Sequence, residues 1–210
     1  MSFQELNAQY LAYLAQYPLA TKSVTSGILN GLNETISSAI TNEYKESRIL
    51  GLKIKHVFSS KLVKMIIYGS LISTPISHKM YGVINKIFKG PLTPKQKILQ
   101  ILTSLFTVTP TLSACFVAWI GLINNYQPKS FSICEIGRIY TVIKTSLQKG
   151  YLPVLRSSMV TSFLALVVAQ KFVKPELWVV FFNLIFFVLG TYQNTKLKKL
   201  QKKQRLEKSE

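Results

Sequence analysis

The chain has 210 residues, of which 48% are hydrophobic, and yet its formal net charge is +18. This length allows one ordinary domain or one compact bundle of helices in lipid. The basic residues stand between long uncharged runs, whereas a soluble protein that binds nucleic acid spreads them over its surface. The composition therefore predicts an integral membrane protein and excludes a nucleic acid as its partner.

The first 22 residues contain an amphipathic stretch in which Tyr10, Tyr13 and Tyr17 recur at helical spacing before Pro18. Tyrosines beside a membrane segment favour the membrane–water interface, because the ring can be half buried while its hydroxyl stays wet. Packing of this helix against its neighbours would produce the same spacing. Both interpretations stay open.

The segment at about 24–40 repeats a small residue at every fourth position, and the pattern recurs in the segment at about 65–84. Small residues let neighbouring membrane helices approach closely. The candidate helix-packing residues are Ser23, Gly27, Gly31, Gly69 and Ser73. In the second segment we expect Pro75 to kink the helix or to end its regular part.

Polar side chains occupy the opposite arc of the 24–40 segment. A carboxylate at membrane depth is costly unless it is neutralised, paired or hydrated, so Glu34 is a functional hypothesis. The candidate pore-lining residues are Asn30, Asn33, Glu34, Ser37 and Ser38. Two alternatives stay open. In the first, Glu34 lies near the segment's end or pairs with a lysine such as Lys79, and serves only packing or topology. In the second, the whole segment lies flat on the membrane surface.

Later uncharged runs lie at 98–123, 157–170 and 177–193. A membrane span needs about 20 helical residues, so the run at 157–170 is short for crossing and predicts a tilted or half-inserted helix. The stretches 41–64 and 124–156 are interpreted as connections, and 196–210 as a solvated basic tail. We predict an all-α polytopic membrane bundle over residues 1–195, with about four transmembrane helices and one short helix.

The number of spans decides the orientation. With four spans, the basic residues divide twelve against thirteen between the two sides, which favours neither. A fifth span at 157–170 would divide them seven against eighteen.

The sequence contains few residues in patterns typical of a catalytic site or a metal site. Its eight acidic residues form no carboxylate pair within an apolar segment, and no nucleophile or phosphate-loop motif is present. The two histidines and two cysteines lack metal-ligand spacing. We therefore predict no enzymatic activity, no catalytic residue, no cofactor and no metal site.

Two blocks of sequence resemble the Mpv17/PMP22 family of organelle membrane proteins. The run from Tyr17 to Leu29 is similar to the family's start, in which a tyrosine-bearing helix leads into a Pro, Thr-Lys and small-residue segment. Tyr68-Gly69, followed at 75–81 by a Pro-x-x-His and an aromatic residue, resembles a second family block. The positions that carry the resemblance are Tyr17, Pro18, Thr21, Lys22, Gly27, Pro75, His78, Tyr81, Pro110 and Pro175.

This resemblance implies a membrane protein of the peroxisome or of the mitochondrial inner membrane. The run at 17–29 is most similar to the peroxisomal branch, so we expect a multi-pass peroxisomal membrane protein, with the mitochondrial inner membrane as the alternative. Two functions stay open: a channel or permeability factor for small metabolites, and a non-conducting structural or interaction protein. The expected partners are the lipid bilayer, small solutes, the machinery that imports peroxisomal membrane proteins, and a second copy of the chain.

Overall fold

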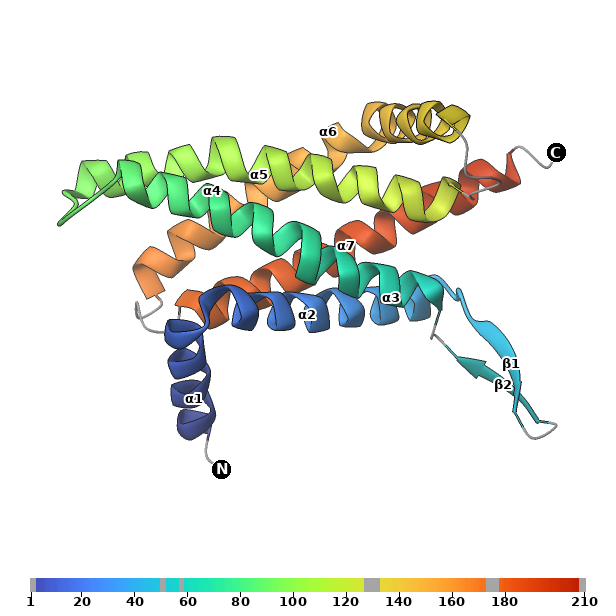
Figure 1. Ribbon diagram of the computed structural model, residues 1–210, viewed down its shortest axis with the longest axis horizontal. Helices are drawn as coiled ribbons and strands as arrows, with labels where there is room; N and C mark the ends of the chain where they lie inside the picture. Colours follow the sequence, from blue (N-terminus) through green and yellow to red (C-terminus); the bar gives the residue numbers. More distant parts are fainter. Residues whose placement is uncertain (1–2, 50–51, 57–58, 127–132, 173–177, 208–210) are drawn as a thin grey trace.

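The computed structural model describes residues 3–49, 52–56, 59–126, 133–172 and 178–207 (Figure 1). Within these ranges the chain is helical apart from one β-hairpin and short connections. Its elements are α1 (Phe3–Gln16), α2 (Pro18–Ile40), β1 (Lys45–Ile49), β2 (Leu52–His56), α3 (Ser60–Ile67), η1 (Tyr68–Ser73), α4 (Thr74–Ile87), α5 (Pro94–Asn125), α6 (Ile133–Phe172) and α7 (Trp178–Leu206).

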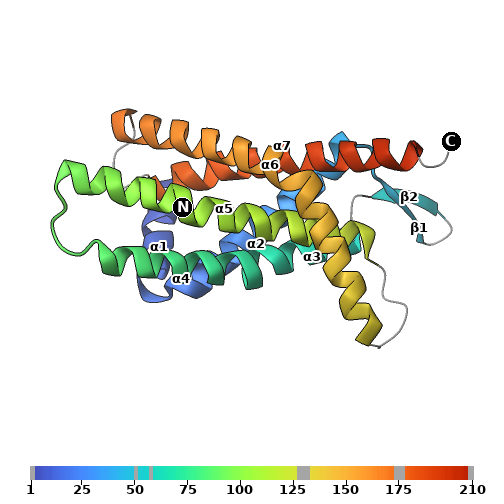
Figure 2. The ribbon, with the colours of Figure 1, turned by 90° about the horizontal axis from the view of Figure 1, so that it is seen from above.

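The long helices lie alongside one another and form a bundle with two distinct ends. Helices α2, α3 to α4, α5, α7 and the C-terminal half of α6 follow its length (Figures 1 and 2). Helix α1 projects steeply from the end where α2 begins, which we call the α1 end (Figure 1). The β-hairpin and the C-terminus of α7 lie at the opposite end, which we call the hairpin end (Figure 1).

Among the described residues, α5 is the one helix long and apolar enough to cross a membrane by itself. It has 32 residues and starts with a capping box, in which Thr93 and Gln96 satisfy each other's backbone N–H groups. Helix α2 carries a polar arc, and α3 and α4 are each short because η1 divides them. For these helices, membrane crossing stays a prediction.

Pro75 affects the conformation of the helical turn that precedes it. A proline inside an α-helix has no N–H to donate, and its ring clashes with the carbonyl group four residues earlier. Before Pro75 the helix widens into the π-helical segment η1, which accommodates the proline, and regular α-helix resumes at Thr74. The Thr74 hydroxyl donates to the Gly69 carbonyl oxygen at 2.8 Å, which satisfies an acceptor within the widened turn.

The two stretches interpreted as connections, 41–64 and 124–156, contain regular secondary structure. Strands β1 and β2 pair antiparallel within 41–64, so the all-α expectation was wrong for this stretch. Helix α6 begins at Ile133 and runs for 40 residues, which makes the run at 157–170 part of a long helix. Pro153 lies inside α6, and Figure 2 shows the helix bending in the middle.

The three glycines among the predicted helix-packing residues lie where α2 meets α3 and η1. Gly27 and Gly31 both face Ile66, and Gly69 faces the backbone of α2. A Cβ atom added at Gly69 would lie 2.6 Å from the Ser26 carbonyl oxygen. Because backbone atoms cannot move aside as a flexible side chain does, this position is closed to larger residues.

We therefore expect Gly69→Ala to destabilise the bundle by about 1–3 kcal/mol through overpacking. Gly82→Ala is the matched control, because a Cβ at Gly82 in α4 would meet nothing within 4 Å. That control should be neutral or stabilising by up to about 1 kcal/mol, since glycine is a poor helix former. The free energy of unfolding in detergent measures both variants, and equal values would contradict the close contact.

Candidate functional site

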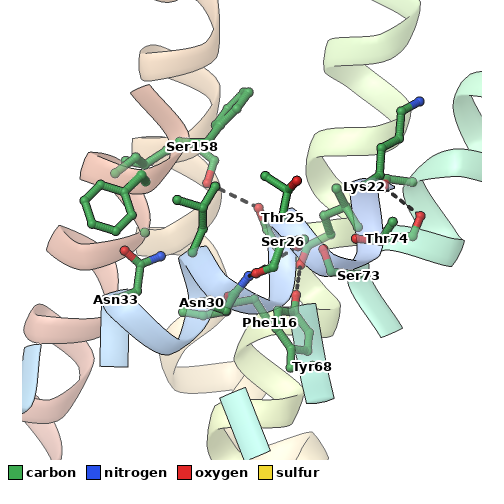
Figure 3. Close-up of a pocket in the computed structure, with 18 of the residues that line it drawn as sticks. Lys22, Thr25, Ser26, Asn30, Asn33, Tyr68, Ser73, Thr74, Phe116 and Ser158 are labelled. Carbon is green, nitrogen blue, oxygen red and sulfur yellow. Dashed lines mark hydrogen bonds between the residues drawn. The ribbon is translucent and has the colours of Figure 1, made fainter. Parts of the chain in front are cut away.

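A cavity of about 560 Å³ lies among the helices, between the α1 end and the middle of the bundle. Its wall mixes aromatic rings with many hydroxyl and amide groups, and Figure 3 shows labelled members from α2, η1, α4, α5 and α6. We call it the first cavity. Its polar lining includes Thr25, Ser26, Asn30, Asn33, Thr74, Ser113, Ser158, Ser162 and Gln193.

The sequence of α2 explains its share of this wall. Asn30 donates from Nδ2 to the Ser26 carbonyl oxygen at 2.8 Å, which holds the amide close to its own helix. Asn33 accepts through Oδ1 a hydrogen bond from the Thr191 hydroxyl on α7. Gly190 permits this approach, since a Cβ there would lie 2.7 Å from the Asn33 amide nitrogen. The polar arc of α2 thus turns inward, toward α7 and the cavity.

Both blocks that resemble the Mpv17/PMP22 family contribute to the cavity at the α1 end. Lys22 comes from the first block, and His78 and Tyr81 from the second. The Tyr17-Pro18 pair forms the corner between α1 and α2, where the Thr21 hydroxyl donates to the Tyr13 carbonyl oxygen at 3.0 Å. The corner brings Tyr10 and Leu14 of α1 to the cavity wall. Pro110 lies inside α5, and Pro175 lies outside the described residues.

A buried charge network joins α2 to α7 beside the first cavity. Lys198 donates from Nζ to Glu34 Oε1 at 2.7 Å and to the Ser38 hydroxyl at 2.7 Å. Asn194 donates from Nδ2 to Glu34 Oε2 at 2.9 Å and to the Ser37 hydroxyl at 2.9 Å. The side chains of Lys198 and Glu34 are each 2% exposed. The carboxylate therefore meets a cation and an amide in place of water.

A second carboxylate extends this network toward the hairpin end. Glu43 Oε2 lies 3.3 Å from Lys61 Nζ and 3.6 Å from Lys198 Nζ. Burial alone would raise the pKa of the Glu43 carboxyl, but the two ammonium groups outweigh it and the pKa lies below its ordinary value. Lys198 is thereby shared between the carboxylates of Glu34, on α2, and Glu43, which follows α2.

The predicted pore-lining residues divide into two groups. Asn30 and Asn33 line the first cavity, while Glu34, Ser37 and Ser38 are buried against α7 outside it. The partner of Glu34 is Lys198, whereas the sequence had suggested Lys79 as an example. Whether any of the five lines a pore stays a prediction.

Asn194 and Lys198 are two residues of this network that the sequence did not predict. Lys198 falls within the stretch interpreted as a solvated tail, but α7 continues through it to Leu206 and buries this lysine. A signal did exist: Asn194 and Lys198 are four residues apart, which places them on one face of a continuous helix. That spacing became informative only once α7 was known to continue past residue 195.

Comparison with known proteins identifies relatives over most of the chain. The sequence profile of the Mpv17/PMP22 family matches residues 132–194. The chain is 39% identical over 192 residues to the Woronin body membrane protein wscA of Aspergillus fumigatus, covering 91% of this chain and 76% of that protein.

Two further relatives are more distant. The chain is 30% identical to the Woronin sorting complex protein of Neurospora crassa, covering 91% of this chain and 57% of that protein. It is 24% identical to the peroxisomal membrane protein PMP22 of Arabidopsis thaliana, covering 88% of this chain and 85% of that protein. No solved structure matches the chain significantly.

The charge network yields a prediction about stability. Lys198→Met leaves Glu34 buried without its cation, so we expect a loss of about 3–5 kcal/mol in the free energy of unfolding. Adding Glu34→Gln should recover part of that loss, because no unpaired charge then remains. Lys199→Met, which alters the exposed neighbouring lysine, should change stability by less than about 0.5 kcal/mol.

Unfolding in detergent of Lys198→Met, Glu34→Gln, the double variant and the Lys199→Met control measures the coupling between Glu34 and Lys198. Equal losses from Lys198→Met and Lys199→Met would contradict the buried pair. So would a double variant whose loss equals the sum of the two single losses.

Proposed function

Since this chain belongs to the Mpv17/PMP22 family of organelle membrane proteins, we propose that it lies in the peroxisomal membrane, or in the membrane of an organelle related to the peroxisome, and organises that membrane as part of a protein complex. The observation that carries this proposal is the 39% identity to a Woronin body membrane protein, which extends over 91% of the chain. A second relative is named for a Woronin sorting complex, and a third for the peroxisomal membrane.

The exposed surfaces of the bundle are consistent with such a role. One face of α2 carries large apolar side chains that need lipid or a partner to cover them. The residues of this stripe are Val24, Ile28, Leu32, Ile36 and Ile40, and each is exposed. At the hairpin end, exposed lysines of α7 are placed to meet anionic headgroups or acidic partners, at roughly 1 kcal/mol per basic residue near a lipid surface.

The proposal includes an orientation. If α2, α3 to α4, α5, the second half of α6 and α7 all cross the membrane, the basic residues other than Lys79 of α4 divide seven at the α1 end and eighteen at the hairpin end. The positive-inside rule then places the hairpin end and the C-terminus in the cytosol. Cytosolic partners would accordingly meet the hairpin and the end of α7.

This role predicts both a location and an assembly. The chain, tagged and expressed at its native level, should co-localise with a peroxisomal membrane marker. After extraction in mild detergent, it should be part of a complex whose mass is well above the 23.8 kDa of the chain itself. Fluorescence microscopy, organelle fractionation and native electrophoresis measure the two properties. Co-purification with the mitochondrial inner membrane and absence from peroxisomes would contradict the location. A monomer in the extract would contradict the complex.

Matched lysine variants test the hairpin end. Replacing Lys199, Lys202 and Lys203 of α7 by glutamine should weaken sorting or partner binding. Replacing Lys89, Lys95 and Lys97 at the α1 end removes the same charge from equally exposed positions and should have the smaller effect. Equal behaviour of both variants would mean that the tail charges only keep the helix end in water.

A second candidate function is passage of small solutes, and the first cavity favours it. Hydroxyl and amide groups that line a space inside a membrane bundle are what a hydrated path presents. Purified protein in liposomes should then pass small polyols faster than protein-free liposomes, as measured by swelling. Flux equal to that of protein-free liposomes, from protein shown to be folded, would exclude this function and leave the organising role.

A further inference from the structure

A second cavity, of about 310 Å³, lies between α5, both halves of α6 and α7. Asn125 at the end of α5 and Lys149 and Lys196 are among its lining residues, so it occupies the hairpin end of the bundle. The first cavity reaches the α1 end, where Tyr10, Lys22 and His78 line it. The two cavities therefore follow one another along the length of the bundle.

Among the described residues, two belong to the walls of both cavities. They are Val154 on α6 and Gln193 on α7, and they are 4% and 8% exposed. A residue that borders two spaces and is itself buried forms the partition between them. Val154 fills its part of this partition with an apolar side chain, and Gln193 fills its part with an amide.

Hydrogen bonds to α6 hold the Gln193 amide across the partition. Its Nε2 donates to the Ser158 hydroxyl at 2.8 Å and to the Ser157 hydroxyl at 2.9 Å, with the Val154 carbonyl oxygen at 3.3 Å. Ser113 of α5 contacts Ser158 at 3.4 Å, so three helices meet here. All of these groups are uncharged. The partition can therefore open at the cost of a few neutral hydrogen bonds, without separating an ion pair.

The bend of α6 lies directly beside this partition. Pro153 precedes Val154, and a proline within a helix removes one backbone hydrogen bond and weakens the helix locally. A Cβ atom added at Gly150, one turn earlier, would lie 3.1 Å from the side chain of Val117, so the bent helix packs tightly on α5. A small change in this bend moves Val154 relative to α7, because the two halves of α6 meet at that point.

We propose that the two cavities are halves of one path through the bundle and that Gln193 and Val154 form its closed constriction. This inference rests on the second candidate function, passage of small solutes. Opening would require the Gln193 amide to leave the serine hydroxyls of α6 and Val154 to withdraw with the bend. The path would then run from the α1 end through the first cavity and reach the hairpin end through the second, between α5, α6 and α7.

The lining indicates the class of solute. Lysines stand toward both ends, Lys22 in the first cavity and Lys149 and Lys196 in the second, and no carboxylate is among the described lining residues. Asn194, which lines the first cavity, has a buried Oδ1 atom with no hydrogen-bond donor among the described residues. Such a wall suits small uncharged or anionic molecules that carry hydroxyl groups and disfavours cations.

Cysteine accessibility tests the constriction directly. In a protein with Cys115→Ala and Cys134→Ser, Ser162→Cys places a thiol in the first cavity and Thr145→Cys places one in the second. A membrane-impermeant thiol reagent should reach each cysteine from one side only. With Gln193→Ala or Val154→Ala added, each should become reachable from both sides, and polyol flux should rise several-fold. Gln148→Ala, an exposed change on α6 outside both cavities, is the control.

The outcomes separate the constriction from the path. Unchanged accessibility and flux in Gln193→Ala and Val154→Ala, beside measurable flux of the parent protein, would overturn the constriction and leave the solute function standing. No flux from the folded parent protein would overturn the solute function, and the path that rests on it. Potassium passing as readily as polyols through the opened variants would overturn the solute class. Thermal unfolding of each variant confirms that the bundle is intact.

Discussion

The buried pair of Glu34 and Lys198 is the interaction on which the arrangement of this bundle depends. The two residues are 164 positions apart in the chain, and their 2.7 Å contact joins the first long helix to the last. A charge removed from water is costly unless it is paired and its remaining hydrogen bonds are satisfied. Asn194, Ser37 and Ser38 supply those bonds, so the observed register of α7 against α2 leaves the buried Glu34 carboxylate paired and hydrogen-bonded.

This pair also divides the polar arc of α2 between two tasks. Toward the hairpin end, the polar side chains of the arc form the ion pair and its hydrogen bonds. Toward the α1 end, Asn30 and Asn33 face the first cavity, with Asn33 bonded to α7. The polar arc, whose sequence suggests a pore lining throughout, is therefore structural in one part and a cavity wall in the other. The helices that pack against each part determine its role.

The organising role and the solute path make different demands on the same bundle. An organiser uses the outside: the apolar stripe of α2, the hairpin and the basic end of α7. A path uses the inside, where the two cavities meet at Gln193 and Val154. The uncharged constriction and the charged network begin at consecutive residues of α7, since Gln193 bonds to α6 and Asn194 bonds to α2. One helix thus carries both the contact that holds the bundle together and the residue placed to close it.

The sequence by itself determined the helical membrane class, the resemblance to the family and the glycines that pack closely beside α3. These follow from local properties: uncharged length, small-residue spacing and proline geometry. Only the tertiary structure decided that Lys198 is buried, that the 157–170 run belongs to a bent 40-residue helix, and that Gln193 separates two cavities. The reason is physical. From the sequence alone, a lysine or glutamine of this segment is expected to be solvated. It is buried because a helix distant in the chain, here α2 or α6, packs over it, and local spacing does not identify that partner.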